Sequence, residues 1–381
     1  MCTKGDSFNK IWRHIVRSAG NLVKYAVRGS RVHPCRRPSD KTVVMTRLAT
    51  APHLARRFRL ARVLLVLLLA VVTARCVSRV APRPPAPAPR PDHAVTLRVE
   101  VGTGVDRKLR TLSLEEYVRG SVPAEMPINT DDALGGPLAR LQAILARTYA
   151  LANRGRHRSE GFDLCSSTHC QVYVPAATQG AAVARVVADA VADTHGMIIT
   201  SGNGPIEALF HADCGGHTSS ATAVWGGPSP DYLAGVPDAF CVTEARNHWR
   251  LALGRDHLRR MLNTDTETTV GGRLDDVSIT HRDATGRATQ MEIRGQERRL
   301  VRATQFRAVI TRQLGARAFR STFFRVETSP DGFEFTGQGF GHGVGLCQTG
   351  AIVRVRAGST VEQILDHYYP GTWLERYSTM D

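Results

Sequence analysis

Residues 137–153 read PLARLQAILARTYALAN and form the most regular stretch of the chain. Leu138, Leu141, Leu145 and Ala152 recur at helical spacing, and Gly155 stands where it can end a helix. The pattern therefore predicts a helix over Pro137–Asn153.

The segments that follow this helix predict more helices and several hairpins. Apolar residues on one side indicate helices over Ala181–Thr194 and Ala303–Leu314. Glycine-containing turns between strand-like segments predict two hairpins, and two further strands are expected: Met197–Thr200 with Pro205–His211, Val277–Arg282 with Ala288–Arg294, and strands near Phe323–Val326 and Phe333–Thr336. We expect an α+β fold of mixed helices and antiparallel β-hairpins. Regular βαβ alternation is missing, which argues against a dinucleotide-binding sheet.

The charge is distributed unevenly along the 381 residues, whose formal net charge is +16. Residues 1–92 hold 19 Lys and Arg against 3 Asp and Glu, which leaves 31 basic and 31 acidic residues for 93–381. The folded body is therefore expected to be electrically balanced. Because nucleic-acid binding needs a basic surface on the domain itself, we expect no nucleic-acid partner.

The N-terminal region has the composition of an export signal. A basic segment, 1–62, precedes residues 63–76, which are apolar up to Ala74 apart from Thr73. This arrangement is typical of a secretion signal, and the run is short for a permanent membrane span, although a membrane anchor is the alternative. Met45 would give a signal of conventional length. Cys76 suggests lipidation, but Arg75 does not fit such a site.

A proline-rich linker over residues 77–94 separates this signal or anchor from the body. Its core, APRPPAPAPRPD at 81–92, favours extended polyproline and cannot form a packed core. The body is expected over residues 95–377. We expect an exported protein, periplasmic or in the cell wall, that contacts a membrane only through residues 63–76.

The segment Val122–Pro127, VPAEMP, places one carboxylate between two prolines. Because proline fixes φ and disfavours helix, we expect Glu125 to stand on a stiff loop. The apolar neighbours Ala124 and Met126 could raise its pKa, which keeps a carboxyl protonated so that it can act as a general acid. An ordinary solvated glutamate on a turn is the alternative interpretation.

Two more segments carry polar residues in unusual settings. Gln142 and Tyr149 are seven residues apart and share one helix face, so they could line a groove, and Arg147 could orient a carboxylate. A helix whose polar groups face solvent is the alternative. In Gly337–Gly345, GQGFGHGVG, every second residue is glycine, which in an extended chain leaves one face bare for a ligand or another backbone. A tight structural bend is the alternative there.

Taken in order, six segments resemble the signature of the SpoIID/LytB family: VPAEMP, LQAILARTYAL, CQVY, FHADCGGHTSSATAVWG, GFGHGVGLCQTGA and ILDHYYPGT. The resemblance covers nearly all of residues 95–375. It implies a SpoIID-like catalytic body. SpoIID-type members are lytic transglycosylases that cut peptide-stripped peptidoglycan strands between muramic acid and glucosamine, and LytB-type members enhance a cell-wall amidase.

The resemblance implies that Glu125 is the catalytic residue and that anhydro-muramoyl ends are the product. Peptidoglycan glycan strands are the implied substrate, and no cofactor is required for catalysis. The residues with implied substrate-positioning roles are Gln142, Arg147, Tyr149, His211, His342 and Gln348. Asp213 and Asp238 are candidates for a second carboxylate if the reaction is a hydrolysis. The alternative function is a non-catalytic, wall-binding enhancer with an N-acetylmuramoyl amidase as its partner.

The body contains five cysteines, Cys165, Cys170, Cys214, Cys241 and Cys347. Cys165, His169 and Cys170 could bind zinc with a further ligand from His157, Cys214 or His217, and the resemblance implies a structural zinc in some relatives. The disulfides Cys165–Cys170 and Cys214–Cys241 are the alternative in an exported chain. We interpret Cys347 as a small buried residue.

Overall fold

The computed structural model describes residues 95–102, 106–130, 133–202, 204–241 and 248–377. All of them belong to one compact unit. The expected basic segment, signal or anchor and proline-rich linker lie outside the described residues. Among the described helices, none combines the length and the apolar character that crossing a membrane requires.

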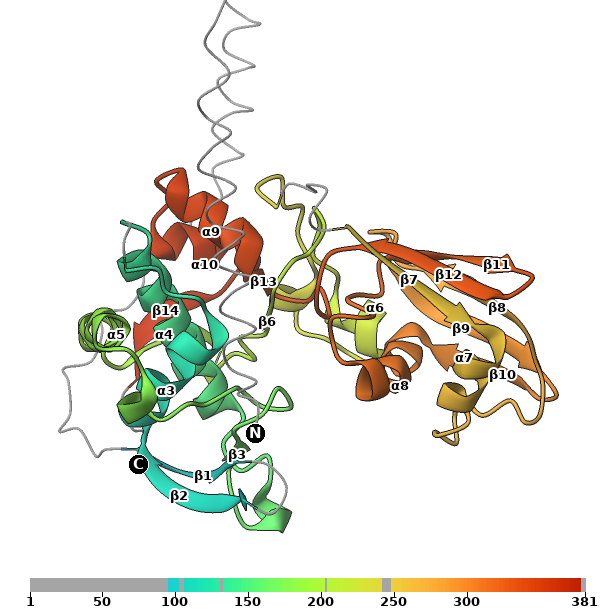
Figure 1. The fold of residues 1–381 in the computed structure, drawn as a ribbon. Helices are drawn as coiled ribbons and strands as arrows, with labels where there is room; N and C mark the ends of the chain where they lie inside the picture. Colours follow the sequence, from blue (N-terminus) through green and yellow to red (C-terminus); the bar gives the residue numbers. More distant parts are fainter. Residues whose placement is uncertain (1–94, 103–105, 131–132, 203, 242–247, 378–381) are drawn as a thin grey trace, which may run out of the picture. The chain divides into compact units, whose positions relative to one another are not determined.

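The described residues confirm an α+β fold with several small antiparallel sheets (Figure 1). A first core forms where helices pack on a mixed three-stranded sheet. Its strands are β1 (Thr96–Val101), β2 (Lys108–Ser113) and β3 (Leu164–Cys165), and the helices are α3 (Leu114–Glu125), α4 (Gly135–Ala152) and α5 (Ala181–Asp193). Strand β1 pairs antiparallel with β2 and parallel with β3. The small residues Ala139, Ala143 and Ala146 are fully buried on α4, which lets helices approach it closely.

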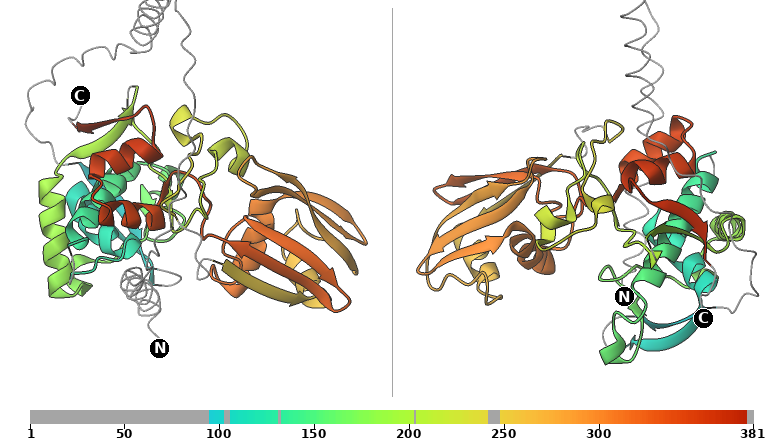
Figure 2. Two further views of the ribbon diagram at one scale, coloured as in Figure 1. Left: turned by 90° about the horizontal axis from the view of Figure 1, so that it is seen from above. Right: turned by 180° about the vertical axis from the view of Figure 1, so that it is seen from behind.

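A second core lies between two three-stranded antiparallel sheets and two helices. One sheet has the order β10 (Arg298–Arg302), β9 (Ala288–Gly295), β8 (Leu274–Arg282), and the other β11 (Phe324–Ser329), β12 (Gly332–Gln338), β7 (His248–Gly254). Helices α7 (Arg255–Leu262) and α8 (Ala303–Leu314) pack against them, around Phe306, Phe319, Phe324 and Phe335. Figure 2 shows these strands and helices gathered together in both views.

The remaining elements bring distant parts of the chain together. Strand β6 (Phe210–His211) pairs in parallel with β13 (Leu346–Cys347), and β4 (Met197–Ser201) lies between β5 (Gly204–Pro205) and β14 (Trp373–Arg376). The helices in these regions are α6 (Ala221–Trp225), α9 (Gln348–Arg356) and α10 (Val361–Tyr368). The β6–β13 pair positions the start of α9 beside a strand more than a hundred residues earlier.

The structure confirms the three expected helices as α4, α5 and α8, and the hairpin expectation around residues 277–294 as β8 and β9. The hairpin expected at Met197–His211 is shorter. Only Gly204–Pro205 pairs back on β4, while Phe210 and His211 join β13. Proline has no N–H to donate to a ladder, so a long second strand beginning at Pro205 is disfavoured.

The glycine-rich segment 337–345 is not the extended strand that the sequence suggested. Strand β12 ends at Gln338, and Gly339, Gly341, Gly343 and Gly345 all have positive φ, between 70° and 107°. This left-handed backbone favours glycine, so the alternating glycines produce repeated reversals instead of one bare face. A Cβ on Gly345 would lie 2.0 Å from the carbonyl oxygen of Leu209, so close backbone approach also requires glycine there.

Candidate active site

Glu125 is the last residue of helix α3 and does not stand on a loop, which corrects the expectation from the bracketing prolines. Pro123 lies inside the last turn, where its missing N–H leaves the Arg119 carbonyl without an intrahelical donor. The side-chain amide of Gln179 donates to that carbonyl at 3.0 Å. Met126 is extended before Pro127 and ends the helix, as a residue preceding proline favours.

The Glu125 carboxyl is half-buried and has one hydrogen-bond donor among the described residues. Val172 N–H donates to its Oε1 atom at 2.5 Å, and Oε2 has no partner in the described part of the chain. Burial raises the pKa of Glu125 to about 7, while the Val172 N–H opposes that shift. The carboxyl is therefore half protonated near neutral pH.

One face of α3 forms a polar row that leads to this carboxyl. Tyr117, Ser121 and Glu125 are spaced four residues apart, and this spacing places them on one side of the helix. The Tyr117 hydroxyl donates to Gln171 Oε1 at 3.1 Å, next to the Val172 N–H. Sequence reasoning missed Tyr117 and Gln171, although both lie in or near motifs that carry the resemblance.

Buried polar atoms without partners lie on α3, on α4 and next to Val172. Ser121 Oγ, Gln171 Nε2 and both amide atoms of Gln142 have no hydrogen-bond partner among the described residues. An unsatisfied buried polar group costs roughly 1–3 kcal/mol, so such atoms need a water or a bound polar molecule. These side chains are suited to hydrogen-bond a polar ligand.

The other residues expected on α4 differ in their surroundings. Arg147 is fully buried, and its Nε and Nη2 atoms form a paired contact with Glu115 at 2.8 and 2.7 Å. Its Nη1 donates to the Met197 carbonyl at 3.0 Å, so Arg147 ties α3 and β4 to α4. Tyr149 is buried, and burial raises its pKa to about 12, so its hydroxyl stays protonated.

Gln348 connects the start of α9 to the end of α3, because its side-chain amide donates to the Glu125 backbone carbonyl at 3.0 Å. This contact positions Glu125 and does not touch its carboxyl. The sequence separation of 223 residues makes it invisible to local pattern analysis.

His211 and His342 lie together beside the β6–β13 pair, with ring centroids 5.5 Å apart. His211 Nδ1 contacts the Val344 carbonyl at 3.1 Å, and its Nε2 is buried without a partner among the described residues. His342 Nε2 contacts the Phe210 carbonyl at 3.0 Å, and its Nδ1 accepts from Val344 N–H at 3.1 Å. Burial lowers the pKa of both, to about 4 for His342, so both rings are neutral at pH 7.

The two aspartates that could supply a second carboxylate are both buried. Asp213 accepts from Gly215 N–H at 2.9 Å, and burial raises its pKa to about 7. Asp238 is fully buried and accepts hydrogen bonds from Tyr368 at 2.6 Å and Arg354 at 3.3 Å. Neither forms a hydrogen bond with Glu125 in the described residues.

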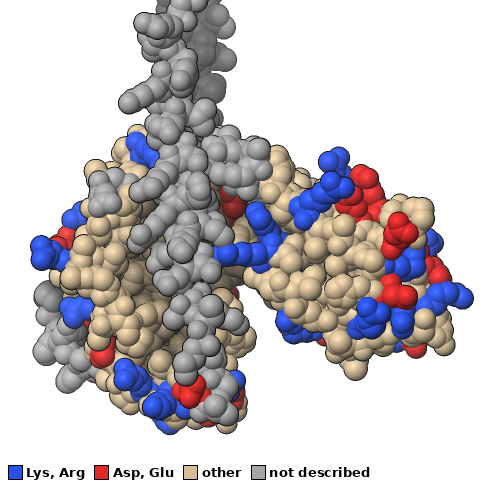
Figure 3. All heavy atoms as spheres, viewed as in Figure 1, with Lys and Arg blue, Asp and Glu red and all other residues tan. Residues whose placement is uncertain are grey.

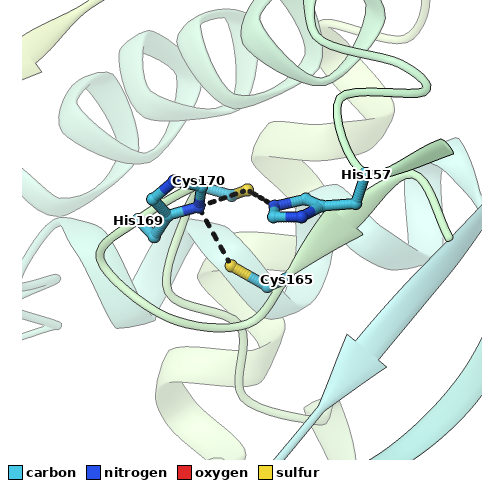
Figure 4. Close-up of side chains that lie close together, drawn as sticks. All are labelled: His157, Cys165, His169 and Cys170. Atoms are coloured by element: carbon cyan, nitrogen blue, oxygen red, sulfur yellow. Dashed lines mark hydrogen bonds between the residues drawn. The ribbon is translucent and has the colours of Figure 1, made fainter. Parts of the chain in front are cut away.

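Four metal-ligating side chains converge next to this site (Figure 4). His157, Cys165, His169 and Cys170 place one ligand atom each within 4.8 Å of all the others, and we call them the Cys–His cluster. Of the three further ligands considered for the expected trio, the structure brings His157 to the cluster. Cys170 lies two residues before Val172, whose N–H contacts Glu125.

The spacing within the Cys–His cluster suits a tetrahedral ion. The contacts His157 Nε2–Cys170 Sγ, His169 Nδ1–Cys170 Sγ and His169 Nδ1–Cys165 Sγ measure 3.3, 3.7 and 3.8 Å. Tetrahedral zinc with ordinary Zn–N and Zn–S bonds gives about 3.6 Å between such atoms. His157 Nδ1 contacts Glu160 at 2.5 Å, the type of carboxylate contact that orients a ligating imidazole. All five described cysteines are free, so neither of the alternative disulfides, Cys165–Cys170 and Cys214–Cys241, is formed.

The described surface carries mixed charge. In the face shown in Figure 3, basic and acidic side chains are interspersed. A shallow cleft between β8 and β11, lined by Asp276, Arg282 and Glu327 among others, shares no residue with the Glu125 site. The Glu125 site is therefore described by its buried polar side chains and not by this cleft.

Comparison with known proteins gives two family matches along the chain. The family model described as stage II sporulation protein (SpoIID) matches residues 104–201, which include Glu125 and the Cys–His cluster. A domain of unknown function, DUF8618, matches residues 241–345.

Relatives of known sequence span most of the body. An uncharacterized protein of Brachyspira hyodysenteriae is 31% identical over 273 residues, which are 71% of this chain and 68% of that protein. Stage II sporulation protein D of Bacillus subtilis is 27% identical over 292 residues, 73% of this chain and 79% of the relative. An amidase enhancer of Bacillus subtilis is 24% identical over 301 residues, 68% of this chain and 40% of the relative. With VPAEMP at the end of α3 and its partners assembled around Glu125, the chain belongs to the SpoIID family of stage II sporulation proteins.

Proposed function

We propose that the chain is a peptidoglycan lytic transglycosylase that cleaves peptide-stripped glycan strands between muramic acid and glucosamine. The observation that carries this proposal is the half-buried Glu125 carboxyl, whose pKa burial raises to about 7. One group that must first donate and then accept a proton works best with a pKa near the working pH. Glu125 meets that requirement without a second carboxylate.

The reaction balances with Glu125 alone. Neutral Glu125 gives its proton to the glycosidic oxygen as the bond from that oxygen to C1 of muramic acid breaks. The resulting carboxylate takes the proton of the primary hydroxyl at C6, whose oxygen bonds to C1 and closes an anhydro ring. No water is consumed, and Glu125 regains its proton for the next cycle.

The surrounding residues support this cycle in distinct ways. Val172 N–H stabilises the carboxylate form at Oε1 and leaves Oε2 for the transferred proton. Gln348 fixes the backbone at Glu125 through its carbonyl. The protonated hydroxyl of Tyr149 is suited to hydrogen-bond a sugar, whereas the amide of Gln142 is fully buried and supports the site from within α4. Of the remaining expected positioning residues, we assign His211 and His342 to the support of the glycine-rich segment and Arg147 to the support of α3.

We further infer that the Cys–His cluster holds a structural zinc ion. Four nitrogen and sulfur ligands fill a tetrahedral shell, which is the composition of a closed structural site. Bound zinc would supply a cross-link that orders residues 157–170. Because Gln171 and Val172 follow directly, that order extends to the Tyr117 hydroxyl and the Glu125 carboxyl.

The reaction class can be tested by incubating the full chain with peptide-free glycan strands and weighing the products by mass spectrometry. The proposal predicts fragments that end in anhydro-muramic acid and are lighter by one water than fragments with a reducing end. Reducing ends would instead show hydrolysis and contradict the internal attack.

The relative named as an amidase enhancer motivates a second measurement. We infer that the chain contacts peptidoglycan and acts near an amidase. If the chain were a non-catalytic enhancer, it would stimulate that amidase on intact peptidoglycan. Stimulation that persists in Glu125→Gln, together with no anhydro product from the unaltered chain, would favour the enhancer over the lytic enzyme.

A further inference from the structure

A second group of metal-ligating side chains lies outside the site already described. Cys214, Asp238, Cys241 and Cys347 are all buried, and their ligand atoms lie within 4.8 Å of one another. We call them the Cys3Asp cluster. Cys214 and Asp238 lie between the two matched family segments, and Cys241 is the first residue of the second one. Cys347 is the last residue of β13, just before α9.

The distances in the Cys3Asp cluster suit one central ion. Cys214 Sγ and Asp238 Oδ2 are 3.5 Å apart. Tetrahedral zinc with ordinary Zn–S and Zn–O bonds places such a pair about 3.6 Å apart. Three sulfurs and one carboxylate oxygen complete a four-ligand shell without an open position, which is the arrangement of a structural site.

Surrounding hydrogen bonds prepare these atoms as ligands. The N–H groups of Cys214 and Gly350 donate to Cys347 Sγ at 3.2 and 3.4 Å, and Gly216 N–H donates to Cys214 Sγ at 3.3 Å. Backbone N–H donors of this kind stabilise sulfur that carries negative charge. The Tyr368 hydroxyl donates to Asp238 Oδ2 at 2.6 Å and so orients the carboxylate.

The packing also keeps this space tight. A Cβ on Gly350 would lie 2.1 Å from Asp238 Oδ2 and 2.2 Å from the Tyr368 hydroxyl. Glycine at this position lets the first turn of α9 approach the carboxylate. The helix therefore begins directly against the cluster.

Two arginines beside the cluster, Arg287 fully buried and Arg354 partly buried, provide the charge argument. Arg287 is fully buried; its Nη2 donates to the Cys214 carbonyl, but its Nε and Nη1 atoms have no partner among the described residues. Arg354 donates to Asp238 Oδ1, and its Nε is unpartnered among the described residues. Buried cations need nearby negative charge, and Asp213 and Asp283 also face Arg287.

A metal–thiolate centre supplies that charge, whereas a disulfide does not. Three thiolates, one carboxylate and one divalent ion together carry a charge of minus two beside the two guanidinium groups. A disulfide between any two of the cysteines is neutral and leaves one thiol over. The full burial of the Arg287 guanidinium therefore favours the anionic centre.

We propose that Cys214, Asp238, Cys241 and Cys347 bind a second structural metal ion of the zinc class. The ion would join the segment after β6, the segment around Asp238 and the start of α9. Cys347 directly precedes Gln348, whose amide contacts the Glu125 carbonyl, so the second ion would hold the helix that positions Glu125. This ion is separate from the one inferred at the Cys–His cluster.

The first test measures metal and mass on the unaltered full chain, purified with zinc present. Elemental analysis should give two equivalents of zinc per chain. Intact mass after denaturation should show that Cys214, Cys241 and Cys347 retain their thiol hydrogens. A single equivalent that the double substitution Cys165→Ser and Cys170→Ser removes, or a chain lighter by two hydrogens with the bond mapped to two of these cysteines, would overturn the proposal.

Paired variants assign each equivalent. The double substitution Cys165→Ser and Cys170→Ser should lower the zinc content to one equivalent, and Cys347→Ser alone should lower it independently. In the chain without the Cys–His cluster, Co²⁺ in place of zinc should give a thiolate-to-cobalt absorption band that Cys347→Ser reduces. A metal-free double variant or an unchanged band would contradict a second site. None of these readouts depends on glycan cleavage.

Discussion

Glu125 experiences opposing influences on its proton. Burial raises its pKa from 4.5 to about 7, and the Val172 N–H acts in the other direction. The folded state therefore binds this proton more tightly than the unfolded state does. Below about pH 4.5 the carboxyl is protonated in both states and costs no stability. Between about pH 4.5 and 7 the folded protein becomes less stable, because the unfolded state ionises more readily.

Glu125→Gln should accordingly make the protein more stable at pH 8 while abolishing cleavage. Glutamine keeps an oxygen for Val172 N–H but cannot ionise, so the gain is on the order of 3 kcal/mol at pH 8 and close to zero at pH 4. Denaturant unfolding of both proteins at the two pH values measures it. Equal stability differences at pH 4 and pH 8 would show that Glu125 has an ordinary pKa.

His169 offers a residue-scale test of the Cys–His cluster. Its side chain is exposed, so truncation to alanine removes little packing. If His169 binds zinc, His169→Ala weakens the site, and a hundredfold loss of zinc affinity lowers stability by about 2.7 kcal/mol when free zinc exceeds the dissociation constants of both proteins. Thermal unfolding with zinc present checks this prediction.

His281→Ala is the matched control, because that histidine is also exposed and lies on β8 away from the cluster. It should leave the melting temperature nearly unchanged. Similar melting temperatures for both variants would remove the support for zinc at the Cys–His cluster.

At the scale of elements, the end of α3 depends on a contact with a distant residue. Pro123 removes the N–H that would bond to the Arg119 carbonyl, and Gln179 replaces it at 3.0 Å. The helix can thus include a proline in its last turn and still present Glu125 from a fixed position.

This dependence predicts a coupling between Gln179 and Pro123. Gln179→Ala should cost about 1 kcal/mol in the natural chain, because it leaves the Arg119 carbonyl without that donor. In a Pro123→Ala background the cost should shrink, since the alanine introduced there supplies a backbone N–H of its own. A double-mutant cycle of unfolding free energies measures the coupling, and strictly additive costs would refute it.

The same example explains what sequence could predict. Helices α4, α5 and α8 could be predicted because their apolar periodicity is strong and local. The helical position of Glu125 could not be predicted, because the contact that compensates for Pro123 comes from the distant Gln179. The path of the glycine-rich segment differs from an extended strand because its glycines adopt positive φ. Long-range pairing also conceals why Cys347, interpreted as a small buried residue, lies among metal-ligating side chains.

At the scale of the whole molecule, three separate parts of the body meet at Glu125. Helix α3 carries it, the segment after the Cys–His cluster donates to its carboxylate, and α9 contacts its backbone. Motif resemblance indicated Glu125 and Gln348, and the spacing of cysteine and histidine in residues 165–170 indicated three of the four Cys–His ligands. It did not indicate which contacts each would make.

The most direct test of the central claim compares two Glu→Gln substitutions on the same helix, α3. Glu116 lies exposed in the first turn of α3, so Glu116→Gln changes charge without touching the site. Release of anhydro-muramoyl ends from peptide-free glycan strands should fall at least a thousandfold in Glu125→Gln and stay near the original rate in Glu116→Gln. Equal release by the Glu125→Gln protein and the unaltered chain would contradict the account.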